Sequence, residues 1–179
     1  MHNDVEQILF SKEQISARTR ELGKQLSEDY AGKNPLLICI LKGSSLFFAD
    51  LVREISVPVY FDFMSISSYG SGTVSSGEVK LIKDLDTSIE NRHVIIVEDI
   101  VDTGHTLSYL IKNLQARMPA SVKVCTLLDK DCRREINLVP DYYGFKVDNY
   151  FVVGYGLDYD EAYRHLPYVG VLKPEIYTK

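Results

Sequence analysis

The chain has 179 residues, of which 45% are hydrophobic and 25% are charged. This length and composition are typical of one globular domain, which we expect to span residues 1–179. The formal net charge of −5 argues against general nucleic-acid binding, for which a basic surface is expected.

The N-terminal part of the chain predicts a helix, a buried strand and a second helix. Apolar residues recur at helical spacing across Leu9–Tyr30, where Ser11 and Gln14 resemble a capping box. The continuous apolar run Leu36–Leu41 is typical of a strand that is covered on both faces. The apolar pattern of residues 46–52 then suggests the second helix.

The next segment combines strand patterns with a Ser- and Gly-rich interruption. Val57–Ile66 is rich in Val, Tyr, Phe and Ile, which favours a strand. Ser67–Gly77 has almost nothing to bury and contains three glycines, so we expect a mobile surface loop. A strand-like pattern resumes over Glu78–Leu85.

Two more buried strands and one helix follow. The apolar runs His93–Val97 and Val122–Leu128 predict the strands, and the apolar residues between Leu107 and Leu114 mark one face of the helix. After Pro140 the chain changes to short strands and turns rich in Tyr and Phe. Because strands alternate with helices, we expect an α/β fold with a twisted, mostly parallel sheet flanked by helices.

The cysteines and the absence of apolar spans indicate the compartment. Cys39, Cys125 and Cys132 form no CxxC pair and no metal-ligand spacing. An odd number of cysteines, with no signal-peptide pattern over Met1–Phe10, favours a reducing compartment, and we therefore expect the cytoplasm. No apolar stretch approaches the length of a membrane span, so we expect no membrane partner.

The strongest local signal is the turn between the third buried strand and the following helix. Backbone N–H groups of Asp102–Thr106 are expected to face outward at a helix N-terminus, which is a favourable place for a phosphate. Gly104 lets a ligand approach the backbone, and the hydroxyl groups of Thr103 and Thr106 add donors. The alternative is that Asp102 or Thr103 only caps the helix.

Two acidic residues before this turn indicate the kind of phosphate. Glu98 and Asp99 lie at the carboxyl end of the strand, where open parallel sheets bind ligands. Carboxylates beside a phosphate repel it unless ribose hydroxyl groups or Mg²⁺ intervene, so the combination indicates a ribose phosphate. Neither the GxxxxGK[ST] pattern of a P-loop nor the GxGxxG pattern of a dinucleotide fold is present.

Val94–Leu107 resembles the phosphoribosyl-pyrophosphate signature of the type I phosphoribosyltransferases. It has four apolar residues, two acidic residues, two apolar residues and then Asp-Thr-Gly-x-Thr. The resemblance implies a core of about residues 36–138 and a small hood of about residues 139–179 with part of the N-terminus. It also implies phosphate contacts from Asp102, Thr103, Gly104, His105 and Thr106, and ribose contacts from Glu98 and Asp99. His105 stands where relatives often carry Lys or Arg.

Three further segments resemble the hypoxanthine-guanine phosphoribosyltransferases, and the bacterial and protozoal short forms in particular. These segments are Leu41–Ser44, Leu127–Lys130 and Phe151–Arg164. In that family a strained, often cis, non-proline peptide follows the lysine of the first segment. The resemblance implies that Lys42, Gly43 and Arg164 bind pyrophosphate.

The same resemblance assigns the base site. It implies that Phe151 stacks on the purine, that the Val152 backbone accepts from the base edge, and that Lys130 donates to the 6-oxo group. Such a lysine favours hypoxanthine and guanine over adenine. Asp158, also beside the base, is implied to hold Mg²⁺ directly or through water, with Glu98 and Asp99 as further candidate ligands.

The resemblance also implies the reaction and its partners. A mobile loop containing Ser68 and Tyr69 closes over the phosphoribosyl pyrophosphate donor, and Asp102 exchanges a proton with purine N7. The products are IMP or GMP and pyrophosphate, and relatives form dimers or tetramers. Two alternatives remain: a regulator that senses the donor on the same fold, which the acidic charge disfavours, and an enzyme for xanthine, uracil or adenine.

Overall fold

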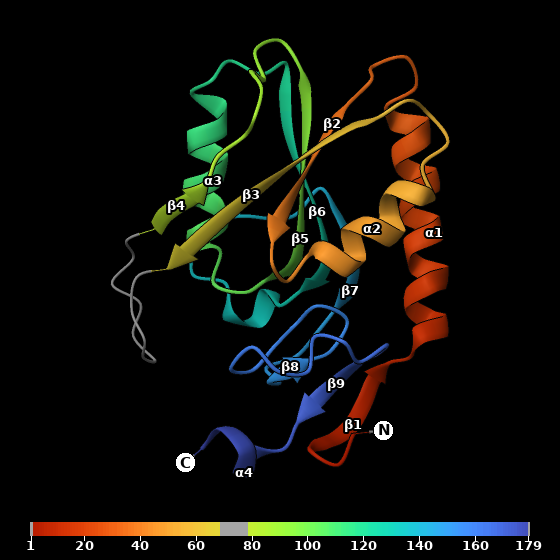
Figure 1. The fold of residues 1–179 in the computed structure, drawn as a ribbon, viewed down its shortest axis with the longest axis vertical. Coiled ribbons are helices and arrows are strands. Elements are labelled where there is room, and N and C mark those ends of the chain that lie inside the picture. Colours follow the sequence, from red (N-terminus) through yellow and green to blue (C-terminus); the bar gives the residue numbers. More distant parts are fainter. Residues whose placement is uncertain (1, 69–78, 179) are drawn as a thin grey trace.

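The computed structural model describes residues 2–68 and 79–178 of the chain. It has an α/β architecture with a large sheet of strand order β4-β3-β2-β5-β6-β7 and a small sheet of order β1-β9-β8 (Figure 1). The predicted fold class, a mostly parallel sheet flanked by helices, is confirmed. Tyr69 and the rest of the predicted mobile loop up to Gly77 lie outside the described residues, and Ser68 is the last residue of β3.

The strands of the large sheet are β2 (Leu36–Leu41), β3 (Tyr60–Ser68), β4 (Val79–Lys83), β5 (His93–Val101), β6 (Ser121–Asp129) and β7 (Tyr142–Lys146). The small sheet contains β1 (Val5–Phe10), β8 (Val152–Val153) and β9 (Val169–Leu172). The helices are α1 (Lys12–Asp29), α2 (Ser45–Arg53), α3 (His105–Gln115), the short 3-10 helix η1 (Asp131–Arg133) and α4 (Pro174–Tyr177).

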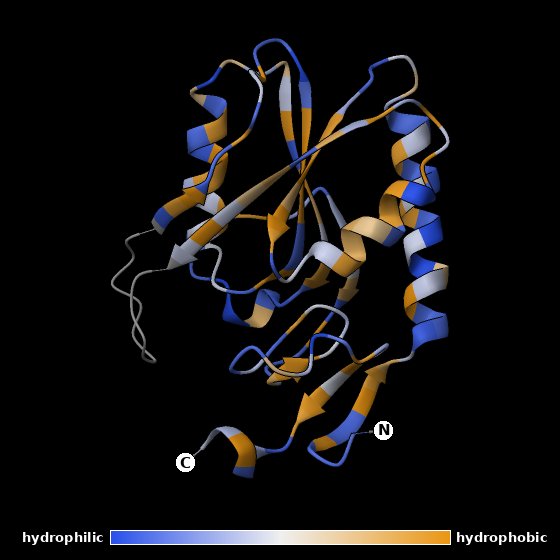
Figure 2. Ribbon diagram, in the orientation of Figure 1, coloured by the Kyte–Doolittle hydropathy of each residue, from blue (hydrophilic) through white to orange (hydrophobic). Residues whose placement is uncertain are grey.

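The central strands of the large sheet are buried on both faces. Its neighbouring strands pair in parallel except β3 and β4, which are antiparallel. Alternate residues of β2 enter two hydrophobic clusters: Leu37 and Cys39 pack with α1 and α2, whereas Leu36 and Ile38 pack with α3. Figure 2 shows hydrophobic residues concentrated in these central strands. Each fully buried aliphatic side chain contributes about 1.5–3 kcal/mol, so this core holds the carboxyl ends of the strands in fixed positions.

The first helix starts later than the sequence predicted. The capping box of Ser11 and Gln14 is present, but the helix begins at Lys12, and Val5–Phe10 form β1 instead. Strand β1 pairs with β9, which lies more than 150 residues further along the chain. The predicted start at Leu9 was wrong because this long-range pairing has no local signal.

The large sheet differs from the prediction at two places. Pairing of β5 with β6 continues to Val101, so Glu98 and Asp99 lie within the strand and not after it. Strand β7 pairs in parallel with β6, so the large sheet continues past residue 138, where the hood was expected to begin.

The small sheet joins the two ends of the chain. Its core contains Val5, Val153, Leu166, Tyr168 and Leu172. Figure 1 shows this sheet beyond the carboxyl ends of the central parallel strands. Among the described residues, no helix has the length and apolar character needed to cross a membrane.

Candidate active site

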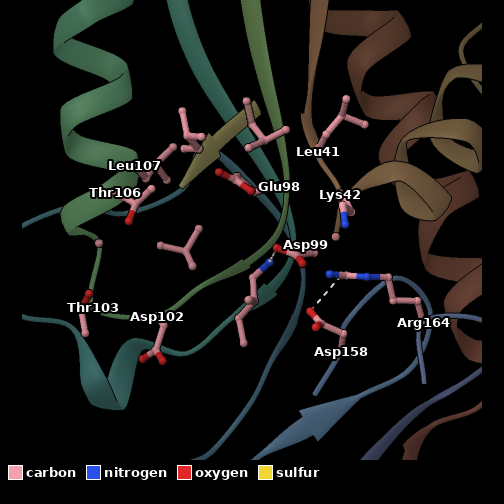
Figure 3. A pocket seen from close by; sticks show the side chains of 16 residues that line it. Leu41, Lys42, Glu98, Asp99, Asp102, Thr103, Thr106, Leu107, Asp158 and Arg164 are labelled. Atoms are coloured by element: carbon pink, nitrogen blue, oxygen red, sulfur yellow. Dashed lines mark hydrogen bonds and ion pairs between the residues drawn. The ribbon is translucent and has the colours of Figure 1, made fainter. Parts of the chain in front are cut away.

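A cavity of about 340 Å³ lies at the carboxyl ends of β2 and β5, beside the first turn of α3 (Figure 3). Of the residues predicted from the sequence, those that line it are Lys42, Gly43, Glu98, Asp99, Asp102, Thr103, Gly104, Thr106, Asp158 and Arg164. His105, Lys130, Phe151 and Val152 lie outside its lining. The cavity therefore brings together segments separated by more than 100 residues.

The turn before α3 has the geometry of an anion site. Gly104 has a φ of 91° and immediately precedes the first helical residue, His105. Most residues with side chains avoid this left-handed conformation, so glycine suits the position. The helix N-terminus adds unpaired N–H groups and a partial positive charge. The imidazole of His105 is exposed and its Nε2 lies 2.7 Å from a carboxylate oxygen of Glu135.

The two acidic residues of β5 have perturbed pKa values. Burial, and next the charge of Asp99, raises the pKa of Glu98 well above its usual range. Burial raises the pKa of Asp99 to about 6, although its carboxylate accepts the Ile100 N–H at 2.7 Å. Raised carboxyl pKa values inside a cleft are typical of binding and catalytic sites.

Gly43 packs directly against the carboxylate of Asp99. A Cβ atom at position 43 would lie 1.7 Å from Asp99 Oδ2, so a larger residue there would displace the Asp99 carboxylate. The cis peptide of this loop joins Leu41 and Lys42. The expectation that it follows the lysine was wrong by one residue, because side-chain patterns do not specify which peptide of a turn is cis.

The two cationic side chains at the other end of the cavity are held by acidic partners. Arg164 Nη1 lies 2.9 Å from Asp158 Oδ1, as Figure 3 shows, and donates to the Gly156 carbonyl at 2.7 Å. Lys42 Nζ lies 2.9 Å from Glu161 Oε2, which is also 3.5 Å from Arg164 Nη2. Glu161 therefore contacts both cations, although no local sequence pattern indicates this contact.

The carboxylate of Asp102 has one oxygen without a partner. Among the described residues, Asp102 Oδ1 is buried and accepts no hydrogen bond, while Oδ2 lies 3.5 Å from Arg133 Nη1. Arg164 Nε is likewise buried without a partner in this part of the chain. Unpaired buried polar atoms are costly in folded proteins, so these two are candidates for contact with a ligand.

The predicted base-binding residues lie at the junction between the large sheet and the small sheet. Lys130 is 5% exposed, donates from Nζ to the Tyr150 carbonyl at 2.8 Å, and has a pKa lowered by burial. Phe151 is stacked on Tyr177 with ring centroids 4.7 Å apart. Val152 is buried in β8, where it pairs with β9.

The carboxylates of the cavity suit a magnesium ion that is held partly by substrate. Glu98, Asp99 and Asp158 supply oxygen atoms, the ligand type that Mg²⁺ prefers. Within residues 2–68 and 79–178, no group of three His, Cys, Asp or Glu side chains is arranged as a metal site. Since Mg²⁺ commonly binds one or two carboxylates, waters and substrate phosphates, a complete protein cage is not required.

Comparisons with known proteins agree with this site. The family described as phosphoribosyl transferase domain matches residues 6–160. The hypoxanthine-guanine phosphoribosyltransferase of Streptococcus thermophilus is 56% identical over 179 residues, which cover 100% of this chain and 99% of that protein.

Solved structures are similar over the same length. A hypoxanthine phosphoribosyltransferase from Staphylococcus aureus has a TM-score of 0.96 at 50% identity, covering 100% of this chain and 97% of that one. The hypoxanthine phosphoribosyltransferase of Trypanosoma cruzi, solved with the product IMP, has a TM-score of 0.92 at 46% identity, with 99% of each chain covered.

Proposed function

The chain belongs to the phosphoribosyl transferase domain family, and we propose that it transfers the 5-phosphoribosyl group of phosphoribosyl pyrophosphate to N9 of hypoxanthine or guanine. The products are IMP or GMP and pyrophosphate, so the chain is a pentosyltransferase of purine salvage. One observation carries the proposal: Asp102, which has a carboxylate oxygen without a partner among the described residues, lines the same cavity as the turn before α3 and the cations Lys42 and Arg164. The names of the relatives support hypoxanthine and guanine as acceptors.

In this proposal, the turn Asp102–Thr106 receives the 5′-phosphate. The left-handed Gly104 and the N-terminus of α3 support this role, since such termini bind anions through backbone N–H groups. Glu98 and Asp99 accept hydrogen bonds from the ribose hydroxyl groups. His105 contributes its backbone N–H, because its imidazole is paired with Glu135.

Pyrophosphate binds between Lys42, the Gly43 backbone and Arg164. Both cations border the cavity, and the buried Arg164 Nε has no partner within residues 2–68 and 79–178. Pyrophosphate oxygens then replace the carboxylates of Glu161 and Asp158 as the partners of these cations.

Asp158, with Asp99 and Glu98, would hold Mg²⁺ together with the substrate. When bound, Mg²⁺ stabilises negative charge on the pyrophosphate oxygens as a Lewis acid. The protein's own cations act on the same charge: Lys42 and Arg164 attract the pyrophosphate as the bond from ribose C1′ to oxygen breaks and its electron pair leaves with the oxygen.

The purine is recognised by Lys130, Phe151 and Val152. Lys130 has three donors and uses one on the Tyr150 carbonyl, which leaves donors for the purine 6-oxo group. Phe151 stacks on the ring, and the Val152 backbone accepts from the base edge. Adenine presents an amino donor to the ammonium group of Lys130, so both donors remain unpaired and binding is weaker.

Asp102 acts as the general base. Purine N9 forms the bond to C1′ while the proton on N7 passes to the unpartnered Asp102 Oδ1. In the reverse reaction the same carboxyl group returns the proton to N7.

A panel of bases tests the function. Hypoxanthine, guanine, xanthine, adenine and uracil are each offered with phosphoribosyl pyrophosphate and Mg²⁺, and pyrophosphate release is measured. We expect fast release with hypoxanthine and guanine. Release only with adenine, uracil or xanthine would refute the assignment of the base, and no release with any base would refute the transferase.

We also propose that the chain assembles into a dimer or tetramer. Leu46 of α2 and Tyr60 and Phe61 of β3 are 40%, 57% and 56% exposed, which supports an apolar contact surface on these elements. Light scattering after gel filtration should give a mass of two or four chains. Replacement of Phe61 by Ser should shift that mass toward one chain, and a wild-type mass of one chain would contradict the proposal.

A further inference from the structure

We propose that Arg134 is a positioning residue for the phosphate-binding turn, holding its backbone in the shape that receives the 5′-phosphate. The proposal rests on the function proposed above. Arg134 does not line the cavity, so it acts through the backbone of Val101 and Asp102. No local sequence pattern indicates this role, because the hydrogen-bond partners of Arg134 lie up to 33 residues away.

The guanidinium of Arg134 joins four segments of the chain. Its Nε donates to the Asp102 carbonyl at 2.9 Å and its Nη2 to the Val101 carbonyl at 3.2 Å. Nη2 also contacts Asp129 Oδ1 at 2.5 Å, and Nη1 donates to the Leu138 carbonyl. The end of β5, the turn, the end of β6 and the following loop are therefore held by one side chain.

Burial makes this cluster rigid. The side chains of Arg134 and Asp129 are 11% and 5% exposed. A buried charge that loses its partner is strongly destabilised, so both groups are held firmly in place. The planar guanidinium presents its donors in a fixed arrangement, which a flexible lysine ammonium cannot reproduce.

The hydrogen bonds to carbonyl groups determine where the neighbouring N–H groups point. In a trans peptide the C=O and the next N–H point in opposite directions. Arg134 donates to the carbonyl groups of Val101 and Asp102, and the Glu135 N–H donates to the Thr103 carbonyl at 3.1 Å. Three successive N–H groups of the turn are thereby directed away from residues 134–135, and such a series forms an anion-binding concavity.

Arg134 also supports Gly104 and connects the turn to the base site. A Cβ atom on Gly104 would lie 3.1 Å from Arg134 Cδ, so the arginine stem lies directly behind the glycine. Lys130 starts the segment that ends at Arg134, and its backbone N–H donates to the Val101 carbonyl at 2.9 Å. The phosphate turn and the purine-binding lysine are therefore fixed by one structural unit.

The test compares a ligand that has a 5′-phosphate with a ligand that lacks one, using the variants R134Q and R134K. Calorimetry measures binding of IMP, and separately of magnesium pyrophosphate, whose proposed contacts are Lys42 and Arg164. We expect R134Q to weaken IMP binding by about tenfold. This loss is expected because the charge-assisted hydrogen bonds that orient the N–H groups of the turn are removed. R134K should recover part of this loss, and pyrophosphate affinity should stay within about twofold of the wild type.

The matched control is R117Q. Arg117 likewise donates several side-chain hydrogen bonds, to Asp84 and Asn113, but it lies beyond the opposite end of α3. R117Q should lower the melting temperature without changing IMP affinity. This separates a general loss of stability from a specific loss of phosphate binding.

The outcomes are distinct. IMP affinity equal to the wild type in folded R134Q overturns the positioning role, and if R134Q does not fold, wild-type affinity in R134K does so. An equal loss of IMP and pyrophosphate affinity also overturns it. If the wild-type protein itself does not bind IMP, the proposed function fails.

Discussion

Three carboxylates on β5 and the turn after it are close in sequence but have different surroundings. Glu98 is buried and Asp99 is partly buried, and this burial raises the pKa of each. Asp102 instead lines the cavity and has one buried oxygen without a partner among the described residues. The first two are suited to accepting or sharing protons with hydroxyl groups, and the third to taking a proton from the base.

Asp102→Asn tests the general base. An amide of the same shape cannot take the proton from N7, so kcat should fall by roughly a hundredfold or more. Steady-state kinetics measures this change, and the melting temperature serves as the control for folding. An unchanged kcat would remove the assigned role.

Asp99→Asn should show a stability difference that depends on pH. The folded pKa of about 6 exceeds the unfolded value of about 3.9, so the folded protein binds more protons between these values. The stability that the neutral carboxyl supplies is complete below about pH 4 and is lost as pH rises through 6.

The variant carries a neutral amide at every pH. Its free energy of unfolding should match the wild type near pH 4 and exceed it at pH 8 by up to about 3 kcal/mol. Urea unfolding at both pH values, without divalent cations, measures the difference. Lower stability of the variant at pH 8 would show that the carboxylate of Asp99 is not strained by burial.

At the scale of elements, the segment between Asp158 and Arg164 closes the cavity on the side of the small sheet. Asp158 Oδ2 accepts the Glu161 N–H at 2.9 Å, and Gly156 fits only because it lacks a Cβ, which would lie 2.0 Å from the Gly43 carbonyl oxygen. The segment is therefore packed on the loop that carries Lys42, and Glu161 is placed on the cations proposed for pyrophosphate.

Glu161→Gln tests whether this carboxylate competes with the donor. Removing its charge frees Lys42 and Arg164 for pyrophosphate, so the KM for phosphoribosyl pyrophosphate should fall by about two- to threefold at low salt. The effect should shrink as salt screens the exposed charges. The same substitution at the exposed Glu175 of α4 is the control, and a raised or unchanged KM would contradict the prediction.

At the scale of the whole molecule, the base site depends on a sheet built from both ends of the chain. Strand β8 carries Val152 and pairs with β9, whose other neighbour is β1. Val5 of β1 is 1% exposed and packs in the core of this small sheet. The N-terminal strand therefore supports the residues proposed to bind the purine.

Val5→Ala should destabilise the small sheet by about 1–2 kcal/mol through the lost methyl groups and the cavity they leave. We also expect weaker IMP binding, because β9 and β8 lose their support. Thermal unfolding and calorimetry measure the two effects. Val139→Ala is the control, since Val139 is 77% exposed and its replacement should change stability by less than about 0.5 kcal/mol. Wild-type behaviour of Val5→Ala would contradict the support role.

Local patterns were sufficient to predict the central elements of the fold and much of the cavity. The apolar runs of β2, β5 and β6, the capping box of α1 and the turn before α3 each depend on neighbouring residues, so a single stretch of sequence contains their signal. The family resemblance then indicated roles for the cationic side chains and the base-binding residues. The local pattern around most of these residues does not indicate such a role.

What only the tertiary structure decided involves partners far apart in the chain. Strand β1 exists because β9 pairs with it, Arg134 matters because the carbonyls of β5 and its turn face it, and Glu161 contacts Lys42 across 119 positions. An exposed charge or a short apolar segment has the same local pattern whether or not such a partner exists. The physical reason is that hydrogen bonds and ion pairs depend on distance in space, which the sequence specifies only through the complete fold.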